Sequence, residues 1–151
     1  MVETKKILFP IDFTDNSIKI LPYVLSVSEK YDGMIYLLHV VEDLSKWSSG
    51  FYIPQISLTR YQKEALKGAE KTMKRVCKEQ LQGSPNFQKR ILSGDPVQEI
   101  LRTIDSEGID LVIMGTHGRK GLEHVFFGSV AENVVKKSPV PVLTINPYKV
   151  K

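Results

Sequence analysis

Glycines and basic side chains gather in one segment near the end of the chain, residues 115–129, with the sequence GTHGRKGLEHVFFGS. Its glycines are Gly115, Gly118, Gly121 and Gly128. Glycines let backbone N–H groups approach an anion closely, and the start of a following helix adds partial positive charge. Arg119 and Lys120 would attract phosphate, and the Ser129 hydroxyl could donate to a phosphate oxygen or cap the helix. The segment predicts a phosphate-binding loop, with glycines that only make turns as the alternative.

Two common phosphate-binding motifs do not fit this segment. A Walker motif requires glycine, lysine and then serine or threonine, but Gly118 is followed by Arg119 and Gly121 by Leu122. The dinucleotide motif GxGxxG requires a second glycine where His117 stands, and it belongs after the first strand of its fold. P-loop NTPases and NAD-binding proteins are therefore disfavoured.

The elements that must hold this loop follow from the apolar pattern of the chain. Short apolar segments predict strands at residues 7–11, 34–41, 87–92, 109–114 and 140–145. Apolar residues at three- and four-residue steps predict helices at residues 14–30, at 59–81, from Asp95-Pro96 onward, and from Gly128-Ser129 onward. Continuous apolar strands that alternate with helices are typical of a parallel sheet covered on both faces, so the predicted class is α/β.

The boundaries of two elements carry further signals. Thr14, Asp15 and Asn16 are candidate N-caps of the first helix. Pro139 and Pro141 cannot donate the hydrogen bonds of a sheet, so the last strand should lie at an edge.

The composition is that of one ordinary globular domain. The chain has 151 residues, 42% hydrophobic and 25% charged, so we expect a single domain over residues 1–151. Its net charge of +4 is spread along the chain, which disfavours a nucleic-acid partner. The single cysteine, Cys77, permits no intramolecular disulfide, and no apolar run approaches the ~20 residues that span a bilayer. We therefore expect a cytoplasmic protein without a membrane partner.

Ligands of open α/β sheets bind beyond the carboxyl ends of the strands, near the point where the strand order reverses. At those ends the sequence places Asp12 after the first predicted strand, Val40 in the second and Gly115 after the fourth. These residues are the ones to examine together with the glycine segment.

The motifs taken together resemble the universal stress protein family. Gly115, Gly118, Gly128 and Ser129 match the family's ATP-binding signature, Gly-x2-Gly-x9-Gly-Ser. Further similarities lie at Pro10-x-Asp12, His39-Val40, Gly94-Asp95-Pro96, residues 110–115 and residues 138–142. The resemblance covers nearly the whole chain. It implies a Rossmann-like, open five-stranded parallel sheet of order 3-2-1-4-5 with helices on both faces, and a switch point between the first and fourth strands.

In family members that bind ATP, the nucleotide lies at this switch point. The resemblance implies that Pro10, Ile11 and Asp12 border the base and ribose here, and that Val40 hydrogen-bonds adenine through its backbone. Whether Asp12 meets a ribose hydroxyl or a Mg²⁺ ion that accompanies ATP stays open, and a helix cap is its alternative role.

The same resemblance implies which residues lie nearest the phosphates. Gly115, Gly118 and Arg119 would follow the ribose and phosphates. Gly128, Ser129 and Val130 would hold the phosphates themselves. Met114 and His117 are further candidate contacts, with an ordinary turn residue as the alternative for His117.

The resemblance favours a nucleotide-dependent regulatory or stress-response module without efficient chemistry of its own. One alternative is a slow ATP hydrolase or phosphotransferase that uses Asp12, Mg²⁺ and Arg119. Another is a scaffold whose pocket is vestigial. The resemblance also implies a homodimer through the last strand, from Val140 to Ile145, where an edge can pair with a second chain.

Other features of the sequence have ordinary explanations. The histidines show no metal-ligand spacing, so we expect no metal held by protein ligands alone. The predicted second helix carries a solvated stripe of Lys63, Lys67, Lys71, Lys74 and Lys78. The segment from Glu42 to Leu58 lacks a regular period and predicts a loop. Its aromatic residues Trp47, Phe51 and Tyr52 would form a lid over adenine, contact a partner or pack on one another.

Overall fold

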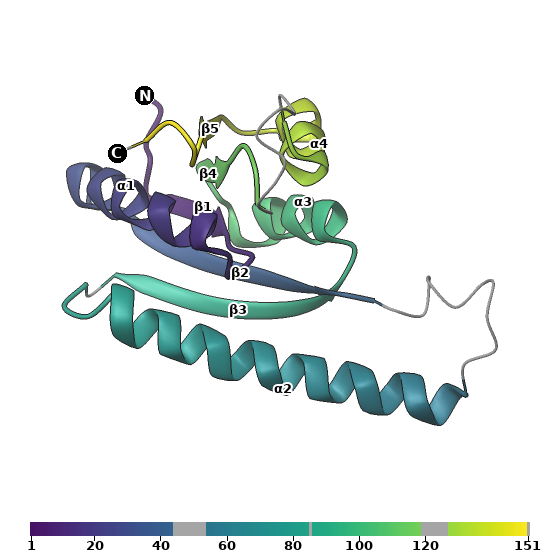
Figure 1. Ribbon diagram of the computed structural model, residues 1–151. Coiled ribbons are helices and arrows are strands. Elements are labelled where there is room, and N and C mark those ends of the chain that lie inside the picture. The colour runs from purple at the N-terminus through teal and green to yellow at the C-terminus, as the bar shows by residue number, and fades with distance from the viewer. Residues whose placement is uncertain (44–53, 85, 119–126, 151) are drawn as a thin grey trace.

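The computed structural model describes residues 1–43, 54–84, 86–118 and 127–150, along which strands and helices alternate (Figure 1). The strands are β1 (Lys6–Pro10), β2 (Met34–Glu42), β3 (Phe87–Gly94), β4 (Leu111–Gly115) and β5 (Val142–Ile145). The helices are α1 (Asp15–Tyr31), α2 (Gln55–Gln80), α3 (Pro96–Glu107) and α4 (Ser129–Lys137). This alternation confirms the predicted α/β class.

The strands form one parallel sheet in the order β3-β2-β1-β4-β5. The order confirms the prediction, and so does the position of β5 at an edge. The strand order reverses at β1, which pairs with β2 on one side and with β4 on the other. The connections that leave the carboxyl ends of β1 and β4 therefore begin side by side, where open α/β sheets bind their ligands.

Side chains of alternate strand residues pack on opposite faces of the sheet. In β1, Ile7 and Phe9 belong to a core formed with α1 and α2, whereas Leu8 belongs to a core formed with α3 and α4. All three are at most 1% exposed. Burial on both faces is the physical reason for the continuous apolar runs that predicted the strands.

Helix α2 differs most from the prediction. It begins at Gln55, inside the segment predicted as a loop, and the N–H groups of Ser57 and Leu58 bond to the Pro54 carbonyl at 3.0 and 3.1 Å. Its first turn is largely exposed, with Ile56 at 84%. The buried residues of the helix are Ala69, Met73, Val76 and Cys77. Because the apolar period is confined to the second half, the predicted start at residue 59 was too late.

Local hydrogen bonds shift the start of two strands. Strand β4 starts two residues later than predicted, because the Ile109 N–H bonds to the Ile104 carbonyl at 3.0 Å and so belongs to the end of α3. Strand β5 starts at Val142, since Pro141 has no N–H to donate and only its carbonyl enters the sheet, accepting from the Val112 N–H at 3.0 Å.

The caps of α1 and α3 follow the expected chemistry. Thr14, one of the three candidates, is the N-cap of α1, and its side chain accepts from the Ser17 N–H at 3.4 Å. Asp95 caps α3 at the predicted start of the helix, with its Oδ2 accepting from the Gln98 N–H at 3.0 Å.

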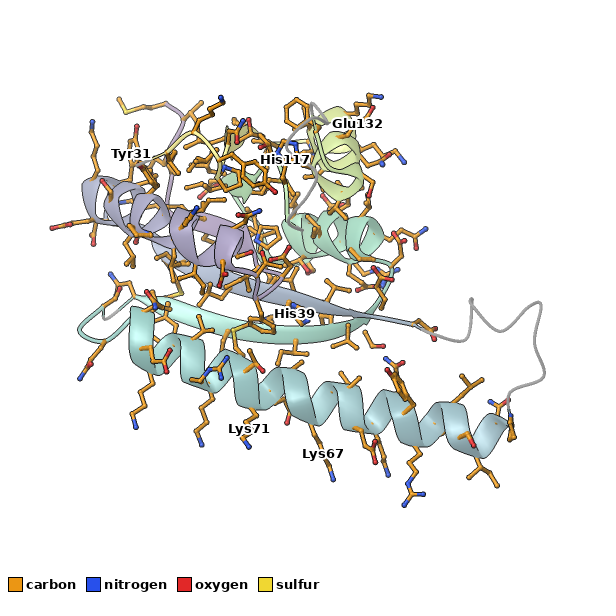
Figure 2. All side chains as sticks on the ribbon, in the orientation of Figure 1. Tyr31, His39, Lys67, Lys71, His117 and Glu132 are labelled. Carbon is orange, nitrogen blue, oxygen red and sulfur yellow. The ribbon has the colours of Figure 1, made fainter. Side chains whose placement is uncertain are left out.

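The predicted lysine stripe lies on the side of α2 that faces away from the sheet. Lys67 and Lys71 point into solvent there (Figure 2), and Lys63, Lys74 and Lys78 are likewise exposed. Cys77 is buried in the core formed with α1 and α2. Within the described ranges, no helix combines the length and the apolarity that crossing a bilayer requires.

Candidate functional site

Asp12 follows β1 and organises the turn into α1. Its Oδ1 accepts from the Thr14 N–H at 3.0 Å, from the Thr14 hydroxyl at 2.6 Å and from the Ser17 hydroxyl. The Ser17 oxygen in turn accepts from the Asp12 N–H at 3.3 Å. Asp12 therefore does not cap α1 itself, because Thr14 does so. The hydrogen bonds of Oδ1 fix the carboxylate, and its second oxygen lies toward the glycine segment.

Gly118 lies directly against this carboxylate. A Cβ built on Gly118 would overlap Asp12 Oδ2 and would lie 3.3 Å from Asp12 Cγ. No other residue can occupy this position without displacing the carboxylate. The structure thus brings together two residues that the sequence separates by more than a hundred positions, as the predicted switch point requires.

The other described glycines of the segment serve close packing. A Cβ on Gly115 would lie 2.5 Å from Ile20 Cδ1, and a Cβ on Gly128 would lie 3.2 Å from the Thr116 carbonyl oxygen. The Gly128 N–H donates to that same carbonyl at 2.7 Å, which ties the two ends of the segment together. Close packing therefore accounts for Gly115 and Gly128 without a ligand, and anion binding by this segment stays a prediction.

The β1–β2 ladder ends before the site. The two strands pair up to Pro10 and Leu38, whereas β2 and β3 stay paired as far as Glu42 and Gly94. Val40 is therefore placed beyond the end of β1, at the open end of the sheet. This placement is compatible with the ligand contact predicted for its backbone.

The His39 side chain bonds to the backbone of Ile11, the residue that follows β1. Its Nδ1 lies 2.7 Å from the Ile11 carbonyl oxygen, and because a carbonyl only accepts, Nδ1 must carry the proton. The Phe13 ring packs on the imidazole with 4.1 Å between centroids. Phe13 has a φ of 65°, a conformation that costs a bulky residue ~1–2 kcal/mol. Sequence reasoning noted His39 only as part of a motif, and its side-chain role emerges from the structure.

The side chains of Ile11 and Met114 belong to the core, at 3% and 5% exposed, so any contact with a ligand would come mainly from their backbone. Pro10, the last residue of β1, is half-buried. His117 is 3% exposed, and its Nδ1 lies 2.7 Å from the Thr116 hydroxyl. The His117 ring therefore takes part in the packing of the glycine segment.

The start of α4 presents backbone N–H groups. Gly128 is the N-cap, and no side chain caps the helix. Ser129, the first helical residue, is exposed, and its carbonyl accepts from Asn133 Nδ2 at 2.8 Å. The predicted capping role of the Ser129 hydroxyl is thus not used, which leaves the alternative of a phosphate contact. Val130 follows in the first turn and is half-buried.

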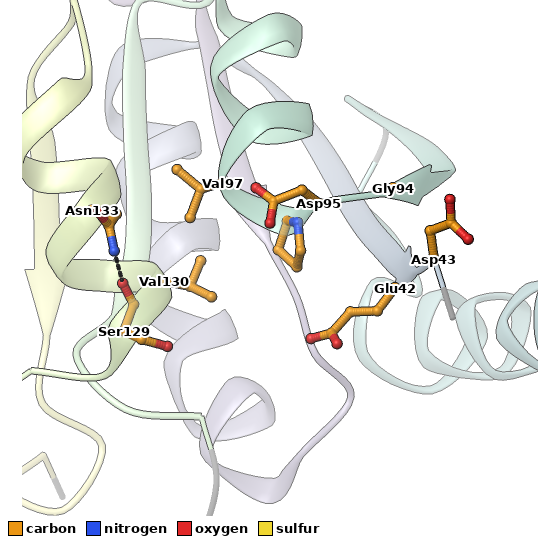
Figure 3. Close-up of a pocket in the computed structure, with 9 residues that line it drawn as sticks. Glu42, Asp43, Gly94, Asp95, Val97, Ser129, Val130 and Asn133 are labelled. Carbon is orange, nitrogen blue, oxygen red and sulfur yellow. Dashed lines mark hydrogen bonds between the residues drawn. The ribbon is translucent and has the colours of Figure 1, made fainter. Parts of the chain in front are cut away.

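A cavity of about 330 Å³ opens beside Ser129 and Val130 (Figure 3). It is lined by Glu42, Asp43, Gly94, Asp95, Pro96, Val97, Ser129, Val130 and Asn133. Three of these residues are acidic, and they come from the end of β2 and the start of α3. Sequence reasoning did not assign the residues from β2 and α3 to the site, although Gly94-Asp95-Pro96 follows a strand end as ligand-binding segments do. The cavity therefore has an acidic side and an α4 side.

Several predicted residues lie outside the described part of the chain. They are Arg119, Lys120, Gly121, Trp47, Phe51 and Tyr52. Among the described residues, no group of three or more histidine, cysteine, aspartate or glutamate side chains is arranged to hold a metal ion.

The family to which these features belong follows from comparison with known proteins. The model of the universal stress protein family matches residues 3–146. The chain belongs to the universal stress protein family. The match includes β1 with Asp12, the described part of the glycine segment, and the whole sheet.

Individual universal stress proteins match over nearly the same length. Universal stress protein MJ0531 of Methanocaldococcus jannaschii is 31% identical over 146 residues, which are 96% of this chain and 84% of that protein. MJ0577 of the same organism is 28% identical over 93% of this chain and 94% of its own length. The solved structure of MJ0577 superimposes with a TM-score of 0.82, covers 96% of this chain and 97% of its own, and is 31% identical in that alignment.

A third universal stress protein shares the fold at lower identity. The structure of the protein from Archaeoglobus fulgidus in complex with dAMP has a TM-score of 0.57 and is 17% identical, covering 97% of this chain and 100% of its own. At this identity the comparison establishes the fold.

Proposed function

We propose that this universal stress protein binds ATP at the switch point of its sheet and acts as a nucleotide-dependent regulatory module of the stress response. The observation that carries the proposal is the contact between Asp12 and Gly118. It places an oriented carboxylate and the start of the glycine segment at the carboxyl ends of the two central strands.

The charges around the site support one orientation of the nucleotide. The N–H groups of Ser129 and Val130 at the start of α4 offer partial positive charge, which suits phosphates, whereas the Gly128 N–H is already bonded to the Thr116 carbonyl. The acidic side of the neighbouring cavity would repel them. In this proposal the phosphates lie between the α4 start and the glycine segment, and Arg119, which follows Gly118 in the sequence, would add positive charge.

The nucleoside then extends toward the ends of β1 and β2. Asp12 Oδ2, which lies beside Gly118, is suited to a ribose hydroxyl or to Mg²⁺ carried by ATP. Pro10 and Ile11 border the base, and the Val40 backbone at the open end of β2 offers hydrogen bonds to adenine. With Asp12 as a single carboxylate from the protein, Mg²⁺ would be held mainly by the phosphates.

A nucleotide is chemically compatible with the family, since a relative has been solved in complex with dAMP. The proposal for this chain is narrower and names ATP. If the protein only senses ATP, phosphate should be released no faster than from ATP in buffer without protein. A slow hydrolase should release it faster, and the Asp12→Ala variant should lose this activity even at ATP concentrations that saturate the variant.

The proposal is tested by thermal melts of the wild-type protein with ATP-Mg²⁺, ADP, AMP, dAMP and GTP. At ligand about 100-fold above its dissociation constant, binding should add ~2.7 kcal/mol and raise the melting temperature by roughly 5 to 10 °C. We expect the largest shift with ATP. Equal shifts of the melting temperature with all nucleotides would contradict ATP selectivity. No shift with any nucleotide would favour the alternative of a scaffold whose pocket is vestigial.

We also propose a homodimer that forms through β5. The strand is at the sheet edge, and Leu143 on it and Val135 on the neighbouring α4 are 42% and 44% exposed. An exposed edge with apolar neighbours can pair with the same edge of a second chain. Light scattering should give twice the mass of 17.1 kDa, and a single-chain mass at micromolar concentration would contradict the dimer.

A further inference from the structure

A turn at the C-terminal end of the chain packs against the start of the glycine segment. The N–H groups of Lys149 and Val150 bond to the Asn146 carbonyl at 3.2 and 3.3 Å, and the Tyr148 N–H bonds to Asn146 Oδ1 at 3.0 Å. These bonds fold the chain back after β5. They bring the Tyr148 ring to the buried His117 ring, with 5.4 Å between centroids.

Asn16, in the first turn of α1, joins this turn to the glycine segment. Its Nδ2 donates to the Gly118 carbonyl at 3.0 Å and to the Tyr148 hydroxyl at 3.1 Å. Because a carbonyl only accepts, the nitrogen of the amide must face Gly118. Asn16 is 3% exposed, so each N–H of its amide needs a protein partner, and the two are Gly118 and Tyr148.

Gly118 is therefore fixed from two sides. The Asp12 carboxylate lies against its Cα, and the Asn16 amide holds its carbonyl. The second hydrogen bond of Asn16 sets the rotation of its amide group, and Tyr148 supplies the acceptor. The Gly118 carbonyl directs its partial negative charge toward the Asn16 N–H. Because that charge is directed to a donor, the arrangement favours an anion next to the segment.

We propose that Tyr148 is a positioning residue that acts through Asn16 to hold Gly118 in the geometry a nucleotide requires. The inference rests on the proposed nucleotide site and adds the C-terminal turn to it. The turn follows the edge strand β5 directly, and the Thr116 N–H bonds to the Ile145 carbonyl at 2.9 Å. The end of β5 and the start of the glycine segment thus form one connected unit.

The test compares Tyr148→Phe with wild type and with Tyr31→Phe. Tyr148→Phe removes the hydroxyl and keeps the ring beside His117, so the fold should persist. Tyr31 is 50% exposed on α1 and serves as the matched control. Two quantities are measured: the affinity for ATP-Mg²⁺ by titration calorimetry, and amide hydrogen exchange over residues 116–118 in the ligand-free protein.

We expect Tyr148→Phe to bind ATP about 3- to 10-fold more weakly, the equivalent of one ordinary hydrogen bond, and to exchange faster at residues 116–118. Loss of the acceptor for a buried Asn16 N–H should lower the melting temperature by a few degrees, while the exchange of α2 should match wild type. In Tyr31→Phe, the ATP affinity and the exchange at residues 116–118 should both match wild type. Faster exchange throughout the sheet would indicate a merely structural role and overturn the proposal.

Wild-type affinity or wild-type exchange at residues 116–118 in Tyr148→Phe would also overturn the proposal. If the wild-type protein binds no nucleotide, the proposed function fails. The exchange comparison alone then decides whether Tyr148 holds the glycine segment.

Discussion

Gly118 and Asp12 approach each other so closely that a Cβ on the glycine would overlap the aspartate Oδ2. One follows β4 and the other follows β1, the two central strands at which the sheet order reverses. The contact joins the turn after β1, which carries Asp12, to the start of the glycine segment. It also makes the site sensitive to a single methyl group.

Gly118→Ala should therefore abolish or strongly weaken ATP binding, by at least about 10-fold, because the added methyl displaces the Asp12 carboxylate. Titration calorimetry with ATP-Mg²⁺ measures the effect. Gly68→Ala is the matched control, since a Cβ on Gly68 meets nothing within 4 Å. That substitution should leave ATP affinity unchanged and stabilise α2 by up to ~1 kcal/mol. Wild-type affinity in Gly118→Ala would contradict the role of the contact.

His39→Phe should weaken ATP, ADP and AMP by similar factors, about 3- to 10-fold each. The variant keeps a ring against Phe13 but loses the donor that holds the Ile11 carbonyl, so the end of β1 beside the base shifts. The three dissociation constants are compared by titration. His39→Asn restores a side-chain N–H near the same place and should recover part of the affinity. A loss confined to ATP would instead place His39 beside the phosphates.

Asp110→Ala should destabilise the fold without changing nucleotide affinity. Asp110 Oδ2 accepts from the N–H groups of Lys5 and Lys6 at 2.9 Å each, at the amino ends of β1 and β4 and away from the site. Loss of this acceptor should lower the free energy of unfolding by ~1–3 kcal/mol, as measured by urea denaturation. Asp105→Ala, on the exposed surface of α3, should have little effect. Reduced ATP affinity in folded Asp110→Ala would contradict the expectation that Asp110 stabilises the fold without affecting the site.

Cys77 should react slowly with thiol reagents in the native protein. Burial raises the pKa of its thiol, and the nearby positive charge of Lys89 lowers it in part. Because the pKa is raised in the folded state, the thiol's contribution to stability is complete below the pKa of the unfolded chain. It is lost as the pH rises through the folded value. Unfolding free energies at increasing alkaline pH should fall less steeply in Cys77→Ala, and identical slopes would contradict this effect.

The sequence was sufficient to predict the strands, the start of α3 and the α/β class, because apolar runs buried on two faces and the signal at Asp95-Pro96 are local patterns. The strand order came from the family resemblance. The start of α2 was not predictable in this way, since residues such as Ile56 are helical yet exposed and carry no apolar period. The family resemblance placed Asp12 and Gly118 at one site. Their direct contact depends on how two distant turns meet, which no local pattern encodes.

The roles of His39 and Tyr148 were missed for the same reason. His39 bonds to a carbonyl of the neighbouring strand, and Tyr148 reaches Asn16 across 132 positions of sequence. Each depends on side-chain geometry across two elements. The acidic cavity residues were missed because Glu42 ends β2 and Asp95 caps α3, and these structural roles explained both residues without a ligand.

The claim that ATP binds at the switch point is tested most directly by mapping amide chemical shifts of the isotope-labelled protein during titration with ATP-Mg²⁺. ATP bound there should cause saturable shifts at Asp12, Gly115, Gly118 and the first turn of α4, with small shifts along the lysine face of α2. Shifts concentrated on α2, or none at the ends of β1 and β4, would contradict it.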